Sequence, residues 1–202
     1  MCMPPCHDPK ATGGLQPLLP QDDELIGALV NRLSPEQNRM RFHRAVKPTP
    51  TLLNYLAWVD YQQHLALVLT AQIDGVETVI GDVRFFVDAE DSEAAEFSLM
   101  VDPRFQRRGL GRWAMQALQA AAARLGLSCL HGCVDTGNTG MLALMQRCGC
   151  LLTRDREDRN MMNGDHRQQS LHSRRSLCIR ELRRPGPVFV LRKARYEFHE
   201  CW

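Results

Sequence analysis

The stretch from Val101 to Arg112, Val-Asp-Pro-Arg-Phe-Gln-Arg-Arg-Gly-Leu-Gly-Arg, connects an apolar run that alternates like a strand to the start of a predicted helix. After it, apolar residues recur at helical spacing from Leu110 until Gly126, where the helix is expected to end. Gly109 and Gly111 lack a Cβ atom and let a ligand approach the backbone, and the N–H groups of a first helical turn face such a ligand. The stretch therefore predicts an anion-binding loop that suits a phosphate group.

Periodicity and turn residues predict an ordered series of helices and strands around this loop. Expected helices begin near Asp22, at Pro35 after a Ser34 cap, near Thr51, at Leu110 and at Asn138. Expected strands cover residues 65–72, 77–87, 95–101, 127–134, 151–154 and 188–192, with an Asp74-Gly75 hairpin turn between the first two. This order predicts an α/β fold with a mixed, mostly antiparallel sheet flanked by helices.

The chain is expected to form one domain, because 202 residues of 44% apolar composition suit a single well-buried core. Residues 1–20 carry five prolines, which indicates a flexible leader before a domain at residues 21–202. Residues 158–186 are polar and rich in arginine. We expect them to form a mobile basic insert with a short helix around residues 176–183.

Charge and segment composition limit the possible partners. The net charge is only +2, and a basic C-terminal part is more often a solvated surface than a binding site, so no nucleic-acid partner is expected. No segment has the ~20 apolar residues that cross a bilayer, and no membrane partner is expected. Residues 1–10 lack the pattern of a signal peptide, so the eight cysteines are expected to stay reduced in the cytoplasm.

Two groups of possible metal ligands occur in the sequence. They are Cys2, Cys6 and His7, and then Cys129, His131 and Cys133. Neither group has the paired Cys-x-x-Cys spacing of a zinc site. No metal is therefore expected.

The pattern Gln106-x-x-Gly109-x-Gly111 lacks the Lys-Ser/Thr pair of a P-loop and the glycine spacing of a dinucleotide-binding loop. It resembles the acyl-CoA pyrophosphate loop of the GNAT superfamily of N-acetyltransferases. The segment from Asn138 to Gly149 resembles the next motif of that superfamily, in which an Asn starts a helix that ends in Gly. The resemblance implies the GNAT fold and acetyl-CoA as co-substrate.

Further stretches resemble the acetyltransferase domain of Pat-type protein lysine acetyltransferases. They include Arg32-Leu-Ser-Pro-Glu36, Met40-Arg-Phe42, Asp60-Tyr61, Leu65-Ala-Leu67, Ala95-Glu-Phe97 and Asn138-Thr. The Pat-like proteins use the Glu of the Ala-Glu-Phe phrase as general base, so the resemblance assigns that role to Glu96. The alternative for Glu96 is a surface glutamate at the start of a strand.

The resemblance also assigns cofactor contacts. The backbone of Leu99, Met100 and Val101 is expected to bind the pantetheine arm and to help hold the thioester oxygen. The expected contacts in and around the loop are Gln106, Arg107, Arg108, Gly109, Leu110, Gly111 and Arg112. Some of these arginines are expected to be merely solvated. Asn138 is expected to contact the pantetheine, to cap its own helix, or to do both.

These features favour an enzyme that transfers acetyl from acetyl-CoA directly to a primary amine in a ternary complex, with a protein lysine as the favoured acceptor. A free lysine amine has a pKa near 10.4 and is mostly charged at neutral pH, so a base must lie near it. The acid-rich run of residues 88–93 is expected to attract a cationic acceptor. A small amine or polyamine is the alternative acceptor.

A non-catalytic acyl-CoA sensor is the alternative from another functional class. Many members of the superfamily have a Tyr general acid at the position of Met145, and a methionine cannot donate a proton. Cys148 and His131 are candidates to replace that Tyr, and each has a packing role as its alternative. A thiol with a pKa of about 8.5 can leave as thiolate with little help, so the enzyme remains the favoured interpretation.

Overall fold

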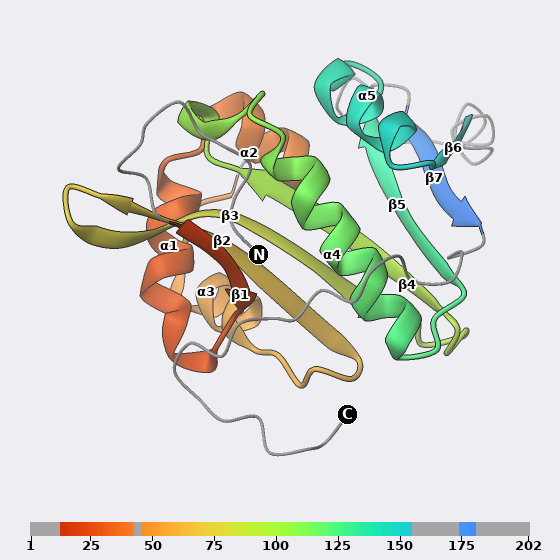
Figure 1. The fold of residues 1–202 in the computed structure, drawn as a ribbon, viewed down its shortest axis with the longest axis horizontal. Helices are drawn as coiled ribbons and strands as arrows, with labels where there is room; N and C mark the ends of the chain where they lie inside the picture. The colour runs from red at the N-terminus through yellow and green to blue at the C-terminus, as the bar shows by residue number, and fades with distance from the viewer. Residues whose placement is uncertain (1–12, 43–45, 155–173, 181–202) are drawn as a thin grey trace, which may run out of the picture.

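The computed structural model describes residues 13–42, 46–154 and 174–180, in which strands form one sheet with helices on both faces (Figure 1). The strands are β1 (Gly13–Pro17), β2 (His64–Ile73), β3 (Val76–Val87), β4 (Ala94–Val101), β5 (Cys129–Asp135), β6 (Leu151–Arg154) and β7 (Arg174–Arg180), in the order β1-β2-β3-β4-β5-β7-β6. The α-helices are α1 (Asp23–Asn31), α2 (Pro35–Phe42), α3 (Pro50–Ala57), α4 (Leu110–Arg124) and α5 (Thr139–Arg147). All neighbouring strands are antiparallel except β4 and β5, which confirms the predicted mixed, mostly antiparallel sheet.

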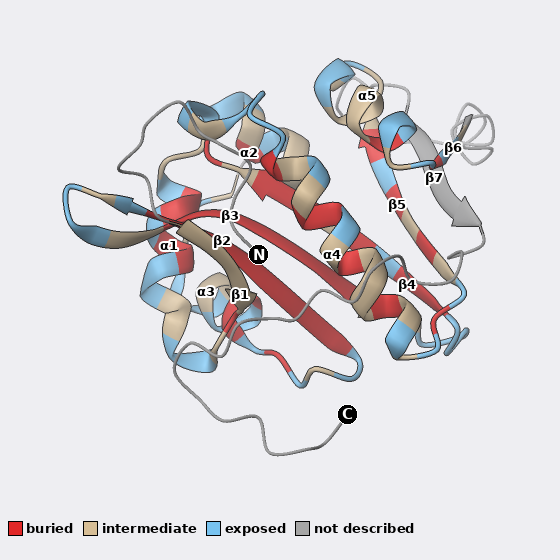
Figure 2. Ribbon diagram, viewed as in Figure 1, coloured by how far each residue is buried: buried red, intermediate tan, exposed pale blue. Residues whose placement is uncertain are grey.

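Two apolar clusters cover the two faces of the sheet. Leu65, Leu67 and Leu69 of β2 belong to the cluster under α4 and α5. Ala66 and Val68 belong to the cluster under α1 and α3, so side chains alternate between the faces with the period of two that a strand requires. Figure 2 shows buried residues along β2, β3 and β4 and along the side of α4 that faces them. The central strands therefore form a rigid support for a site at their ends.

Helix starts follow the local signals of the sequence. Gln37 N donates to Ser34 Oγ at 3.2 Å, and Ser34 N donates to Gln37 Oε1 at 3.0 Å, which is the predicted capping box of α2. Leu52 N donates to the hydroxyl of Thr49 at the start of α3. These side chains satisfy first-turn N–H groups that would otherwise lack partners within their helices.

Residues 13–17 depart from the expected leader. They form β1, an edge strand that pairs antiparallel with β2. Pro17 is tolerated because it lies at the end of an edge strand, where its missing N–H breaks no central ladder, and Leu15 packs against the core. The expected leader through residue 20 is therefore wrong for this segment, and residues 1–12 lie outside the described residues.

The last strands of the sheet also differ in part from expectation. β6 forms where predicted, but its partner is β7, which pairs antiparallel with both β5 and β6. The expected helix around residues 176–183 is wrong for residues 176–180, which belong to β7, and residues 181–183 lie outside the described residues. The expected insert at residues 158–186 is interrupted by this strand. Leu177 and Ile179 alternate with polar or small residues, a period of two that suits a strand. The expected strand at residues 188–192 lies outside the described residues.

β4 and β5 pair with each other only through their first residues. The paired residues are Ala94↔Cys129, Ala95↔Leu130 and Glu96↔His131. Pairing ends there, although β4 continues to Val101 and β5 to Asp135, and each strand keeps its outer neighbour to its end. The sheet therefore opens between β4 and β5, and Figure 1 shows the two strands diverging beside α4 and α5.

Candidate active site

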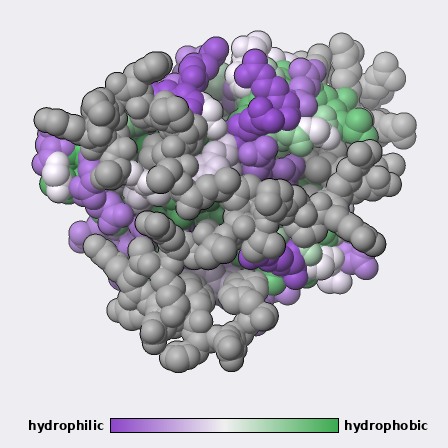
Figure 3. Space-filling model, viewed as in Figure 1, coloured by the Kyte–Doolittle hydropathy of each residue, from purple (hydrophilic) through white to green (hydrophobic). Residues whose placement is uncertain are grey.

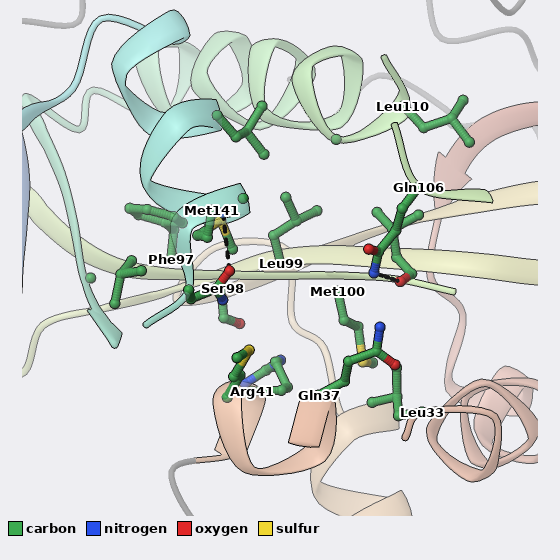
Figure 4. A pocket seen from close by; sticks show the side chains of 18 of the residues that line it. Leu33, Gln37, Arg41, Phe97, Ser98, Leu99, Met100, Gln106, Leu110 and Met141 are labelled. Carbon is green, nitrogen blue, oxygen red and sulfur yellow. Dashed lines mark hydrogen bonds between the residues drawn. The ribbon is translucent and has the colours of Figure 1, made fainter. Parts of the chain in front are cut away.

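A cleft of about 1240 Å³ occupies the opening between β4 and β5. It is lined by the start of α4 and by α5 on one face of the sheet, and by α2 on the other. Figure 4 shows Leu99, Leu110 and Met141 on the first side of β4, and Leu33, Gln37 and Arg41 on the second. The cleft thus passes through the sheet, so two molecules that enter from opposite faces would meet beside β4.

The predicted anion loop has the backbone that its glycines permit. Gly109 precedes the first turn of α4 with a φ of +82°, and Arg107 has a φ of +61°, a conformation that costs a non-glycine residue roughly 1 kcal/mol. A Cβ at Gly111 would lie 3.0 Å from Leu144 Cδ2, so any larger residue would occupy cleft space at this point. The positive end of α4 therefore borders an open space that suits a phosphate group.

Asp102 anchors this loop, a role that no sequence motif indicated. Its buried carboxylate accepts hydrogen bonds from Arg32 Nε at 2.8 Å and from Arg104 N at 3.0 Å and Arg104 Nη2 at 2.8 Å. Burial would raise the pKa of Asp102, but the hydrogen bonds from Arg104 and Arg32 outweigh it and lower the pKa to about 2. Gln106 Nε2 also donates to Val101 O at 2.9 Å. These bonds tie the loop to the ends of α1 and β4.

The structure brings most of the expected cofactor residues together. Of the expected residues, those that line the cleft are Leu99, Met100, Val101, Gln106, Arg107, Gly109, Leu110, Gly111, Arg112 and Asn138. Arg108 is the exception: it is not among the described residues that line the cleft, and its guanidinium lies over the ring of Phe105, 5.3 Å from the centroid. The side-chain Oδ1 of Asn138 accepts a hydrogen bond from Met141 N at 3.0 Å, so this residue caps α5 as well as lining the cleft.

Glu96 lies where the two strands part. Its side chain is exposed, whereas Phe97 and Leu99 belong to the cluster under α4, and Met100 belongs to the cluster under α1 and α3. Glu96 therefore shares a face of β4 with Met100, as the predicted alternation requires. This face carries α2, so the carboxylate stands on the side of the cleft opposite the anion loop.

Arg41 of α2 is a charged residue of the cleft that the sequence did not single out. Burial lowers the pKa of Arg41 to about 10, and the charge of buried Asp82 opposes this shift. The charge of Glu96 opposes the shift as well, which places Arg41 and Glu96 within electrostatic range of each other. Among the described residues, no hydrogen-bond partner serves the buried Arg41 Nε. Arg41 and Glu96 thus both line the cleft, and this side of it carries a cation as well as the carboxylate.

The candidate replacements for a Tyr general acid lie apart from the cleft. Met145 is fully buried, and its Sδ lies 3.7 Å from Cys150 Sγ. His131 Nε2 lies 2.7 Å from Asp88 Oδ2, and burial raises the pKa of the Cys148 thiol. Neither His131 nor Cys148 is among the described residues that line the cleft. The packing and pairing roles therefore account for both side chains.

On the face drawn in Figure 3, hydrophilic residues gather in the upper part, where α4 begins and α5 lies. Within the described ranges, no helix combines the length and the apolar composition needed to span a bilayer. The same ranges hold no group of three or more His, Cys, Asp or Glu side chains placed to bind a metal ion.

Known proteins resemble this chain in sequence and in fold. The model of the acetyltransferase (GNAT) family matches residues 32–150. Acetyltransferase Pat of Mycolicibacterium smegmatis is 35% identical over 141 residues, which cover 70% of this chain and 42% of that protein. An acetyltransferase of Pseudomonas aeruginosa is 30% identical over 145 residues, which cover 71% of this chain and 77% of that protein.

Solved structures extend the likeness to the fold. The GNAT domain of S. lividans PAT superposes on this chain with a TM-score of 0.69 at 20% sequence identity. The match covers 84% of this chain and 90% of that domain's chain. At that identity the likeness concerns the fold alone. The chain spans less than half the length of the Mycolicibacterium relative, at 42%. The family match over more than half of this chain, together with a relative matched over most of its length, shows that the chain belongs to the acetyltransferase (GNAT) family.

Proposed function

We propose that this chain transfers the acetyl group of acetyl-CoA to a primary amine, and that the acceptor is the side chain of a protein lysine. The observation that carries the proposal is the cleft through the sheet, with an anion loop at one end and Glu96 on the opposite face. Two substrates could bind from opposite faces and react directly, which uses proximity and orientation rather than a covalent enzyme intermediate. The likeness of several stretches to Pat-type proteins supports lysine as the acceptor.

The loop and β4 would hold the co-substrate in different ways. The backbone N–H groups around Gly109 and Gly111, at the positive end of α4, suit the pyrophosphate. Beyond Glu96, no described strand pairs with the edge of β4 that faces β5, whereas the other edge of β4 pairs with β3. Alternate backbone groups of residues 97–101 therefore point into the cleft. They can bind an extended pantetheine arm like an added strand and donate to the thioester oxygen.

Glu96 would act as the general base that accepts protons from the acceptor amine. An ammonium group must lose one proton before its nitrogen can attack, and a second proton leaves the nitrogen after attack. The N–C bond forms, the C–S bond breaks, and the electron pair leaves with the sulfur as thiolate. Glu96 accepts a proton directly or through one water and, being exposed, releases it to solvent. Because a thiol has an ordinary pKa of about 8.5, this step does not require a proton donor at Met145.

An acceptor panel tests the proposal. Purified protein is incubated with acetyl-CoA and lysine-containing proteins, free lysine or a polyamine, and CoA release is followed together with mass spectrometry of each acceptor. We expect steady CoA release with acetylated protein lysines. Transfer to free lysine or the polyamine alone would reassign the acceptor class. Acetyl-CoA binding without transfer to any acceptor would instead support the sensor.

Gly111→Asp should weaken acetyl-CoA binding at least about tenfold, or ~1.4 kcal/mol. The new Cβ would lie 3.0 Å from Leu144 Cδ2. The added carboxylate would also bring a negative charge to the loop that is proposed to hold the phosphates. Calorimetry with acetyl-CoA measures the effect. Gly111→Ala adds the Cβ without the charge and should show a smaller loss. Unchanged affinity in a folded Gly111→Asp protein would remove the loop from phosphate binding.

The acids of the β3–β4 loop give a prediction about the acceptor. Asp88 pairs with His131, and Asp91 Oδ1 accepts a hydrogen bond from Glu93 N at 3.0 Å, whereas the Glu90 and Glu93 side chains are exposed. The double variant Glu90→Gln/Glu93→Gln should raise the acceptor KM about two- to fivefold at low salt, because it weakens the attraction of a cationic acceptor. The KM for acetyl-CoA should stay the same.

The matched control removes the same charge from α1. Asp23→Asn/Glu24→Gln alters a half-buried and an exposed acid at the start of that helix and should leave the acceptor KM unchanged. Both variants are measured by initial-rate kinetics at low and at physiological ionic strength, where the Debye length is about 8 Å. If the loop variant and the control have the same acceptor KM at low salt, the loop takes no part in attracting the acceptor.

A further inference from the structure

An aromatic ring closes the narrow end of the cleft. Pairing of β4 and β5 ends at Glu96↔His131, and Phe97 and Gly132 are the next residues along the two strands. Both line the cleft. A Cβ at Gly132 would lie 3.2 Å from Phe97 Cε1 and 3.4 Å from Phe97 Cζ. The ring therefore occupies the space in which a side chain at Gly132 would stand, and it fills the apex of the opening.

The ring of Phe97 has little freedom to move away. Phe97 is 5% exposed and belongs to the apolar cluster under α4, together with Leu130 and Val134 of β5. The backbone approaches closely as well, since a Cβ at Gly132 would lie 3.1 Å from Phe97 O. Interiors packed in this way transmit strain rather than yield to an added group. The ring of Phe97 thus forms a fixed wall at the narrow end of the cleft.

We propose that Phe97, admitted by Gly132, limits the acyl group of the co-substrate to a short chain and makes the site selective for acetyl. This inference rests on the proposed function, which places the phosphates at the loop and the arm along the free edge of β4. From Val101 back to Phe97 the strand covers about 13 Å, at ~3.3 Å per residue, and leads directly to the ring. A thioester near this end directs its acyl carbons at the ring, so each added methylene must displace a packed side chain.

The test compares acetyl-CoA, propionyl-CoA and butyryl-CoA, by calorimetry and by kcat/KM with one acceptor. The wild-type protein should favour acetyl-CoA over butyryl-CoA by at least about tenfold, since one misfitting methylene already costs roughly 10–200-fold. Phe97→Leu shortens the side chain and keeps it apolar. It should raise the ratio of butyryl-CoA to acetyl-CoA, in kcat/KM and in affinity, about tenfold above the wild-type ratio.

Phe85→Leu is the matched control. Phe85 lies opposite Phe97 on β3 and is buried in the same cluster, but it is not among the described residues that line the cleft. The control should leave the butyryl-to-acetyl ratio at its wild-type value. If Phe97→Leu does not fold, Phe97→Met replaces it as the variant with a slimmer side chain.

Two results would overturn the inference. One is a wild-type protein that binds and uses butyryl-CoA as well as acetyl-CoA, and the other is a folded Phe97 variant whose ratio stays within about twofold of wild type, below the range of a single methylene. The proposed function fails in a different way. In that case neither the wild-type chain nor any variant transfers acetyl to an acceptor. The calorimetric preference for acetyl-CoA over butyryl-CoA still persists and supports Phe97 as the residue that limits the acyl chain.

Discussion

Glu96→Gln is expected to lower kcat about 10²–10⁴-fold near pH 7 and to leave the affinity for acetyl-CoA nearly unchanged. Gln keeps the size of the side chain but cannot act as a base. Because Glu96 stands on the face of β4 that carries α2, whereas the anion loop borders α4, the two effects should separate. Initial rates at saturating concentrations of both substrates give kcat, and calorimetry gives the acetyl-CoA affinity.

The pH dependence of the Glu96 variant distinguishes a missing base from a damaged site. Its rate should recover in part at high pH, because more of the acceptor amine is then already deprotonated. Glu24→Gln, which alters an exposed glutamate of α1, serves as the control and should keep kcat within about twofold of wild type. A kcat for Glu96→Gln within about threefold of wild type at pH 7 would rule out the general-base role.

Features with a local cause could be predicted from the sequence. The capping box of Ser34 and Gln37 and the helix start after Gly109 depend on neighbouring residues alone. The two faces of β4 followed from a period of two, which places Glu96 and Met100 together. The loop and Glu96 lie in motifs that are short in sequence, so their place on β4 and at the start of α4 could be predicted to the same extent, whereas their roles in binding and catalysis stay predictions.

Features that join distant segments could not be predicted in this way. The hydrogen bond between Arg32 and Asp102 joins residues that are 70 positions apart, and no pattern near either residue predicts it. The packing of Phe97 on Gly132 depends on where the pairing of two strands ends, which no local pattern records. The edge strand at residues 13–17 was missed for the same reason, dependence on a distant segment. These residues form a strand because they pair with β2, not because of their own composition.

A buried ion pair beneath α3 carries the largest expected effect on stability. Arg84 and Asp82 are both 0% exposed, and Arg84 donates from Nε to Asp82 Oδ2 at 2.9 Å and from Nη2 to Asp82 Oδ1 at 2.7 Å. Arg84 Nη1 donates to Leu56 O at 2.7 Å, which ties the end of α3 to β3. The same nitrogen lies 3.3 Å from His64 Nε2. Burial and the nearby Arg84 charge lower the pKa of His64 to about 4, so its imidazole is neutral near pH 7.

Arg84→Met should lower the free energy of unfolding by about 3–5 kcal/mol, because the buried Asp82 carboxylate loses its partner. For a domain of this size the melting temperature should fall by roughly 6–20 °C. Urea unfolding followed by circular dichroism measures the loss. Asp82→Leu/Arg84→Met removes both charges and should recover most of the stability, whereas Arg124→Met, at an exposed position of α4, should cost less than about 1 kcal/mol. A double variant less stable than Arg84→Met would show that an unpaired buried charge is not the cause of the loss.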